Sequence, residues 1–430
     1  MNLKKNFLNL FLLVLILLVL ISPILYWISL RGNWEKVSVV EGRKLAVFPK
    51  DTFRIIKSAL KQVIRGKLNE ANKLFFKKVI DESFQKQIAS AIADQFPLRI
   101  KMTEFSRTIE RGLISAAYTA VPDPAIPASI DSQIFVTRDK SRLLPPPISF
   151  NLTRKNSIDL RIENYKKLLN ENPRVNFFIF NIETIHYSKF HPLATYFNNA
   201  DNGRSLIYFI ENKPYNLGFE CFKISSYEDF ESNYFRTDHH WNINGALKAY
   251  RLLYNLVSSK YEDISPMVEI RKISPIQGVE FLGSYARKSL YPIKPEAFEY
   301  ADVALPLYKT YVNNELKTFG GRAHYLLGNF SRDKYVDHYR GFYGSWEKII
   351  MYEFQNPSER NLLIIASSYA RMNQELLASH YHRTYVIDLR DDDVKAISLS
   401  QMMKEYQIDD MLIIGQPSVT YSSSQYLITP

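Results

Sequence analysis

The hydrophobic pattern is most regular near the end of the sequence, where short apolar runs alternate with segments of helical spacing. Apolar runs at residues 362–365, 384–389 and 411–414 predict three strands. The segments between them, up to residue 376 and over residues 393–406, carry apolar side chains at helical intervals. This order of strand, helix and strand predicts a parallel sheet with helices on its faces.

The same alternation begins near residue 130. Between about residues 265 and 355 the pattern is irregular and rich in Tyr, Phe and Gly, apart from a predicted hairpin over 309–319 that turns at Asn313 and Asn314. We therefore predict one α/β domain over residues 126–430, with an irregular insertion at about 265–355. Its remaining predicted strands are 133–136, 175–182 and 221–224, and its remaining predicted helices are 158–169, 204–211 and 246–257.

A long uncharged apolar run, residues 6–30, follows Lys4 and Lys5. About 20 apolar residues span a bilayer, whereas the apolar region of a cleaved signal has about 7–15. Because no small-residue cleavage site follows, residues 1–30 are predicted to be a cytoplasmic stub and a transmembrane signal anchor, which places the bulk of the chain outside the cytoplasm at the cell membrane. A long cleaved signal is the alternative.

Residues 31–125 are predicted to form a helical juxtamembrane region. Apolar side chains recur at helical spacing over residues 53–64 and 75–80. A proline-rich run at residues 122–127 then interrupts the pattern, as expected for a linker or domain boundary.

Charge and cysteine content narrow the range of partners. The formal net charge of +11 suits an anionic neighbour such as a lipid surface or an acidic polymer. The basic residues are scattered and no nucleic-acid motif is present, so no nucleic-acid partner is predicted. Cys221 is the single cysteine, which excludes an intrachain disulfide and a cysteine cluster for zinc.

The run from Thr237 to Ala246 carries the clearest chemistry. Asp238 lies two residues before His240, and a helix is predicted to begin just after, with Asn242 or Asn244 as its cap. An Asp that orients a His, and a His that deprotonates a hydroxyl, form the base half of a serine hydrolase or acyltransferase. The alternative is that the histidines only pack as polar groups near the helix cap.

Three other classes of protein share an Asp-His-His run. Membrane palmitoyltransferases need a cysteine next, where this chain has Trp241. Manganese phosphoesterases need further aspartates at preceding strand ends, and no such set is found. Zinc binding by three consecutive residues is not expected, because neighbouring residues rarely converge on one ion. No metal site is therefore predicted.

The run from Tyr234 to Trp241, with Gly245 and Ala246 following, resembles the signature of the DHHW protein family. That family is similar to the alginate O-acetyltransferase proteins, which have an SGNH-hydrolase-like fold. Three further segments resemble the family in the expected order: residues 93–99, residues 281–285, and residues 362–369 with the following 385–390. The resemblance implies an SGNH-hydrolase-like parallel sheet flanked by helices.

The resemblance also assigns roles by position. Asp238 would orient the base His240, and Ser368 would be the nucleophile. Gly283 or Arg390 would contribute to oxyanion or substrate binding, with an ion pair to Asp388 or Asp391 as the alternative for Arg390. Trp241 would pack beneath the loop, with sugar stacking as the alternative, and His239 would be a packing residue of the loop.

At the nucleophile the sequence departs from the family. The family usually has Gly-Asp-Ser, whereas this chain has Ala366-Ser367-Ser368. The glycine allows close backbone approach and the aspartate braces the turn, and both are replaced here. Ser367 therefore stays open as an alternative nucleophile.

The resemblance implies an O-acyltransferase, with acetyl as the expected group, or an esterase that acts on cell-surface polysaccharide without a metal or organic cofactor. For a transferase, it implies a multi-spanning membrane acyltransferase as partner. The altered serine turn motivates the alternative, which is a catalytically inactive surface protein that binds glycan or an envelope assembly.

Overall fold

The computed structural model describes residues 37–38, 43–47, 83–95, 99–130, 133–317, 320–344, 347–355, 358–389 and 398–423. Its contacts divide the chain into two compact units, Met1–Glu110 and Arg111–Pro430. The division falls inside helix α5 (Arg99–Tyr118).

Within the first unit, strand β1 (Val37–Ser38) pairs with β2 (Arg43–Lys44), and α4 (Ser83–Gln95) follows. The Ala46 amide donates a hydrogen bond to Asp94 of α4 over 2.7 Å. The predicted anchor at residues 6–30 lies outside the described residues. Of the helices that are described, none has the length and apolar character needed to cross a membrane.

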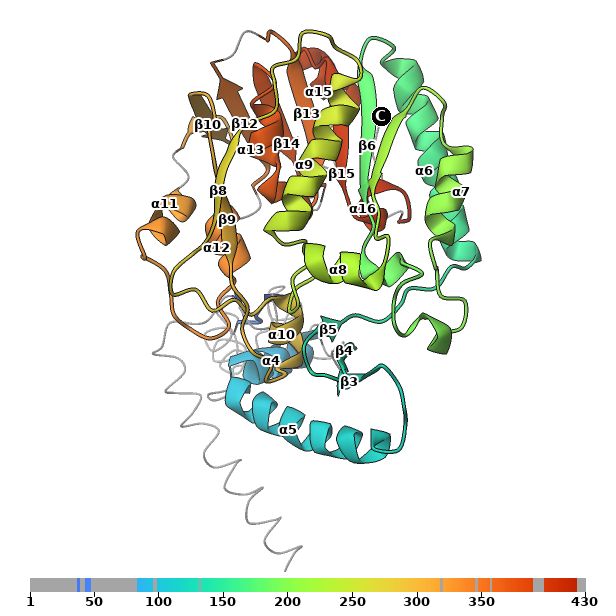
Figure 1. Ribbon diagram of the computed structural model, residues 1–430, viewed down its shortest axis with the longest axis vertical. Coiled ribbons are helices and arrows are strands. Elements are labelled where there is room, and N and C mark those ends of the chain that lie inside the picture. The colour runs from blue at the N-terminus through green and yellow to red at the C-terminus, as the bar shows by residue number, and fades with distance from the viewer. Residues whose placement is uncertain are drawn as a thin grey trace, which may run out of the picture. The chain divides into compact units, whose positions relative to one another are not determined.

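The described residues of the second unit form a mixed α/β structure around an eight-stranded sheet (Figure 1). The strand order is β11-β10-β12-β14-β13-β15-β6-β7, and the five strands from β14 to β7 are parallel. The strands are β6 (Asn176–Ile182), β7 (Gly218–Phe222), β10 (Tyr308–Val312), β11 (Glu315–Leu316), β12 (Ile349–Phe354), β13 (Asn361–Ala366), β14 (Arg383–Ile387) and β15 (Asp410–Gly415).

The central strands β6, β13 and β15 are buried on both faces of the sheet, which explains why they are continuous apolar runs. On β13, Leu362 and Ile364 join the hydrophobic cluster that includes Leu253 of α9 (Ile243–Ser258). The alternate residues Leu363 and Ile365 join the opposite cluster, with α6 (Leu152–Glu171), α7 (Arg204–Asn212) and α15 (Leu399–Glu405). Each fully buried Leu or Ile contributes about 1.5–3 kcal/mol.

The segment from 265 to 355 is more regular than its sequence pattern indicates. Strand β12 pairs antiparallel with β14, and β10 pairs antiparallel with β12, so this segment extends the main sheet. The hairpin predicted at Asn313 and Asn314 is confirmed, since both residues have the positive φ angles, 51° and 68°, of a tight hairpin turn. Strands β8 (Ile270–Pro275) and β9 (Glu299–Val303) form a separate antiparallel pair.

The strand predicted at 133–136 is found as β4, but outside the main sheet. It lies in a three-stranded antiparallel sheet of β3 (Ala125–Ser129), β4 (Ile134–Thr137) and β5 (Leu143–Leu144). The other helices are α8 (Tyr227–Asn233), α10 (Ser284–Ser289), α11 (Gly320–Leu326), α12 (His338–Tyr343), α13 (Gln374–Ala378) and α16 (Pro417–Thr420), with 3-10 helices η1 (Ile185–Tyr187), η2 (Ala194–Tyr196) and η3 (Ser368–Met372).

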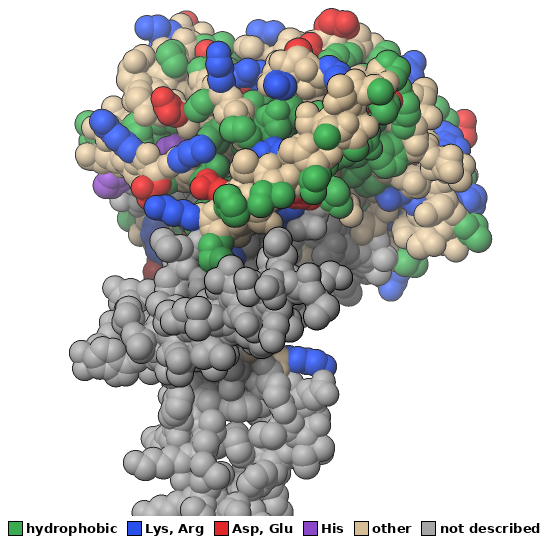
Figure 2. All heavy atoms as spheres, turned by 90° about the horizontal axis from the view of Figure 1, so that it is seen from below, with side chains coloured by type: hydrophobic (Ala, Val, Ile, Leu, Met, Phe, Trp, Pro, Cys, Tyr) green, Lys and Arg blue, Asp and Glu red, His purple; other side chains and the backbone are tan. Residues whose placement is uncertain are grey.

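Charged side chains of both signs are interspersed on the described part of the surface in Figure 2. On this face, lysines and arginines lie among acidic and apolar side chains and do not gather into one stripe. A continuous basic stripe would be the electrostatic mark of a nucleic-acid interface.

Candidate active site

The Asp-His-His run lies in a short loop that leads into α9. The loop is closed by a bridge between Tyr234 and Trp241 and by a hydrogen bond from the Phe235 amide to the His240 carbonyl. The Asn242 side chain then caps α9 by accepting a hydrogen bond from the Gly245 amide over 3.1 Å. The prediction of a loop before a helix start is confirmed, with Asn242 as the cap.

The buried Arg142 and the partly buried Glu296 brace this loop from outside it. The Glu296 carboxylate accepts hydrogen bonds from the amides of Arg236 and Thr237, each over 2.8 Å, and from the Thr237 hydroxyl over 2.6 Å. The Arg142 guanidinium donates to the carbonyl of Phe235 over 2.9 Å. Because buried polar groups are costly unless paired, these contacts favour one conformation of the loop.

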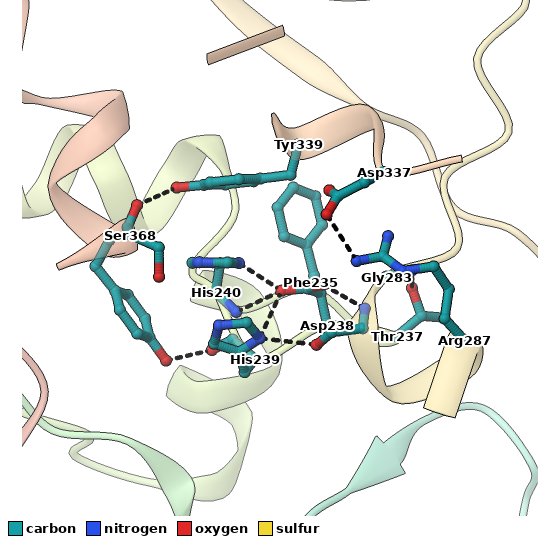
Figure 3. A network of polar contacts seen from close by, with 12 residues as sticks. Phe235, Thr237, Asp238, His239, His240, Gly283, Arg287, Asp337, Tyr339 and Ser368 are labelled. Atoms are coloured by element: carbon teal, nitrogen blue, oxygen red, sulfur yellow. Dashed lines mark hydrogen bonds and ion pairs between the residues drawn. The ribbon is translucent and has the colours of Figure 1, made fainter. Parts of the chain in front are cut away.

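Asp238 and His240 form a buried hydrogen-bonded pair. His240 Nδ1 donates to Asp238 Oδ1 over 2.6 Å, and the other carboxylate oxygen accepts from the Ser284 amide. His240 Nε2 is buried and has no hydrogen-bond partner among the described groups. Figure 3 shows the imidazole between Asp238 and Ser368, with the edge that carries Nε2 turned toward Ser368.

The electrostatics of this pair suit a base. Burial, together with repulsion from His239, lowers the pKa of His240 from 6.5 to about 4, so the imidazole is neutral at pH 7. Burial alone would raise the pKa of Asp238, but attraction to His239 and His240 and hydrogen bonds from them hold it well below 3.8. An ionised Asp beside a neutral His is the state that accepts a proton at Nε2.

Ser368 lies at the carboxyl end of β13, where open α/β sheets place their sites. It is the first residue of η3 and is partly exposed, and its hydroxyl lies on the same side as His240 (Figure 3). No hydrogen bond joins these two side chains, as is common in sites without substrate. The helix predicted to run to Leu376 is broken at Asn373 into η3 and α13.

The alternative nucleophile Ser367 lies in different surroundings. It is 5% exposed, and its Oγ has no hydrogen-bond partner among the described groups. It lines a crevice of about 30 Å³ together with Ser368, Gln416 and Val419. His240 does not line that crevice.

Tyr339 is the residue at this site that the sequence pattern missed. Its ring stacks on His240, with centroids 4.0 Å apart and planes 6° apart. Its hydroxyl donates to the carbonyl of Ser368 over 2.8 Å. Tyr339 therefore links the segment of the base to the segment of the serine, and no short motif around it signals this contact.

Gly283 has a different place from the one that the sequence suggested. Its amide donates to the Thr237 hydroxyl over 2.9 Å, so this N–H is already engaged and is not free for an oxyanion. A Cβ at Gly283 would lie 2.7 Å from the Asp238 Cα and would overlap the Asp238 side chain. The glycine is thus needed for the close approach of α10 to Asp238.

The remaining predicted site residues do not share a single environment. Trp241 is fully buried, with edge contacts to Phe222 and Tyr369 at 5.6 Å, so it packs beneath the loop and cannot stack on a sugar. His239 is partly exposed and forms a 2.7 Å hydrogen bond between its Nδ1 and Ser284 Oγ. Arg390 lies outside the described residues.

The expectation that three consecutive residues do not converge is wrong for this loop. One ligand atom from each of Asp238, His239 and His240 lies within 4.8 Å of the others. However, Nδ1 of His240 is hydrogen-bonded to Asp238, and Nδ1 of His239 to Ser284. With both Nδ1 atoms held in hydrogen bonds, Asp238 and His240 are arranged as an acid–base pair.

Comparison with known proteins gives matches of structure only. No protein-family model matches the chain, and no curated protein matches its sequence. Two solved structures of Bacillus cereus PatB1 are similar, one of them with a sulfonyl adduct. The adduct structure is 17% identical with a TM-score of 0.54, over 69% of this chain and 100% of that chain. The other is 20% identical with a TM-score of 0.53, over 68% and 99%.

Two further matches have lower scores. A DHHW family protein from Eubacterium siraeum is 18% identical, covers 68% of this chain and 94% of that chain, and has a TM-score of 0.49. The O-acetyltransferase domain of Pseudomonas putida AlgJ is 8% identical, covers 69% and 91%, and has a TM-score of 0.35. The chain therefore shares the α/β fold of PatB1, and the solved structures similar to it include a DHHW family protein.

Proposed function

We propose that this protein is a membrane-anchored, extracytoplasmic serine O-acyltransferase or esterase that acts on cell-surface polysaccharide, with acetyl as the acyl group. The observation that carries the proposal is the buried Asp238–His240 pair, whose unpartnered Nε2 faces Ser368. The apolar run at residues 6–30 supports the anchor, and the resemblance of the loop to the DHHW signature supports the acyl chemistry.

The reaction follows from these positions. Ser368 Oγ attacks the acyl carbonyl while its proton passes to His240 Nε2, and Asp238 stabilises the resulting imidazolium. The Ser368 amide begins η3, where helix N–H groups have no acceptor within the helix, so it can donate to the oxyanion. The leaving alkoxide takes the proton. A sugar hydroxyl or water then gives a proton to His240 and attacks the acyl-serine.

A second function is favoured by one feature, the Ala366-Ser367-Ser368 turn in place of Gly-Asp-Ser. Such a chain could keep the fold and bind glycan or an envelope assembly without catalysis. The two functions differ in whether Ser368 reacts as a nucleophile.

A fluorophosphonate probe tests this difference, because it labels only an activated serine. We expect the protein to be labelled, and we expect labelling to fall by about a thousandfold or more in Ser368→Ala and His240→Ala. Ser367→Ala is the matched control and should label as the unchanged protein does. Absence of labelling in a folded, unchanged protein would favour the non-catalytic function.

A further inference from the structure

A cavity of about 80 Å³ is built by the same segments that carry the candidate catalytic groups. Each candidate catalytic segment continues along the chain into the cavity lining. Leu247 of α9 lies a few residues after His240 in sequence, and Tyr343 of α12 lies a few residues after Tyr339. Gln374 likewise comes shortly after Ser368. The rings of Tyr339 and Tyr343 lie 5.1 Å apart, and Tyr339 in turn stacks on His240. Two aromatic rings thus connect the imidazole to the wall of the cavity.

One wall of the cavity carries planar polar groups. The guanidinium of Arg322 lies 3.9 Å from the carboxylate of Glu375, and these side chains are 36% and 30% exposed, so the cavity is open to solvent here. Gln374 is buried; its Nε2 donates to the Tyr352 hydroxyl over 2.6 Å, while its Oε1 has no partner among the described groups. The Arg322 and Glu375 side chains therefore offer charged donors and acceptors to the cavity.

A second wall of the cavity is apolar and partly aromatic, and it lies beside Arg322, whose guanidinium is 5.9 Å from the ring centroids of Tyr300 and Phe342. It includes Tyr300, Phe342 and the aliphatic side chains of Ile243 and Leu247. A volume of 80 Å³ is several times the roughly 10–15 Å³ that one water needs, so a group of several atoms fits. A sugar ring combines hydroxyls at its edge with C–H groups on its faces, which is the chemistry that these two walls present.

We propose that this cavity binds a saccharide unit of the glycan substrate and holds a neighbouring sugar hydroxyl near Ser368. The inference rests on the proposed function and names the part of the protein that selects the acceptor. In the transfer step the sugar hydroxyl gives its proton to His240 Nε2 and forms a bond to the acyl carbon. The bond from that carbon to Ser368 Oγ breaks, and the proton returns to Oγ.

The test compares transfer with hydrolysis in the full chain. Acetyl transfer from p-nitrophenyl acetate to two probes, a hexamer of N-acetylglucosamine and a hexamer of galacturonic acid, is followed by mass spectrometry. Arg322→Met is expected to lower the ratio of transfer to ester hydrolysis by about tenfold, because a charged hydrogen bond to the sugar is lost. Gln374→Met should lower it in the same direction.

Arg174→Met removes an exposed arginine that precedes β6, a strand that does not line the cavity, and is the matched control. It should keep the original ratio. An unchanged ratio in both cavity variants would overturn the inference, and so would hydrolysis without transfer to either hexamer. If the two cavity variants lower the hydrolysis of p-nitrophenyl octanoate more than they lower acetyl transfer, the cavity binds an acyl chain and not a saccharide.

If the proposed function itself is wrong, the unchanged protein shows no Ser368-dependent ester hydrolysis, and this outcome is distinct from those above. In that case, equilibrium binding of the two hexamers to the unchanged protein and to Arg322→Met still tests the cavity. Weaker binding by the variant supports a saccharide site, and equal or absent binding overturns it.

Discussion

Asp238 holds its position through contacts on every side of its carboxylate. One oxygen accepts from the ring and amide of His240, and the other accepts from the Ser284 amide. Gly283 lies against its Cα and Cβ, where no larger residue fits. At the residue scale the direction of the His240 ring therefore depends on a glycine 45 residues away in sequence from Asp238 (283 minus 238).

Gly283→Ala tests this dependence. The added methyl group would overlap the Asp238 side chain, so the Asp–His pair must shift. Because small misplacements of catalytic groups are costly, we expect Ser368-dependent esterase kcat to fall by about a hundredfold while the fold is kept. Circular dichroism checks the fold.

Gly112→Ala on α5 is the matched control, since its Cβ would meet nothing within 4 Å. It should leave kcat unchanged and stabilise the helix by up to about 1 kcal/mol. Equal kcat in the two variants would show that the approach of Gly283 to Asp238 has no catalytic consequence.

At the scale of elements, the loop before α9 is shaped by chain segments far from it in sequence. Glu296, which precedes β9, supplies three of its hydrogen bonds, and Arg142, which precedes β5, supplies another. These partners brace the loop from outside the main sheet.

Glu296→Ala removes the acceptors of the Arg236 and Thr237 amides. Since each buried donor left without a partner costs about 1–3 kcal/mol, we expect unfolding free energy to fall by about 2–4 kcal/mol and kcat to fall with it. Urea unfolding and esterase rates measure both. Exposed Glu280→Ala is the control. A stable variant with normal kcat would show that the loop holds its shape without Glu296.

The sequence pattern predicted the elements whose signal is local. Strands β6, β13 and β15 are apolar runs buried on both faces, and Asn313 with Asn314 marks a hairpin turn. Strand β12 was not predicted, because its alternating burial is decided by β10 and β14 on either side.

In the candidate site, too, some residues have a local sequence signal and others are set only by the fold. Asp238 and His240 lie two residues apart, so a short motif reveals them. Tyr339 and Glu296 reach the site through contacts that span 29 and 59 residues, and the fold alone sets these contacts. For Gly283, the motif indicated proximity to the site, but the structure gives a packing role in place of the oxyanion role.

At the scale of the whole molecule, several buried histidines are kept neutral. Burial lowers the pKa values of His186, His191, His240 and His380 to about 4. In the unfolded chain each would take up a proton near pH 6.5. Between pH 6.5 and 4 the unfolded state therefore binds more protons through these residues, and their contribution to stability is lost as the pH falls.

His380→Gln isolates one of these contributions. The His380 ring is hydrogen-bonded to Tyr250 and Ser265, each over 2.8 Å. Relative to the variant, the unchanged protein should lose up to about 3 kcal/mol of unfolding free energy between pH 7 and pH 4, from a pKa change of 6.5 to about 4. Urea unfolding at several pH values measures this difference. His324→Gln, which changes an exposed histidine, is the control. The expectation is contradicted if the unfolding free energy of His380→Gln changes with pH in parallel with that of the unchanged protein.

The position of β15 between β13 and β6 has a consequence for how the protein is made. Strand β6 can pair with β7 soon after synthesis, but its other edge stays open until β15, the last of the described strands in chain order, has been made. Pairing over such a separation is slow, and an open strand edge invites aggregation.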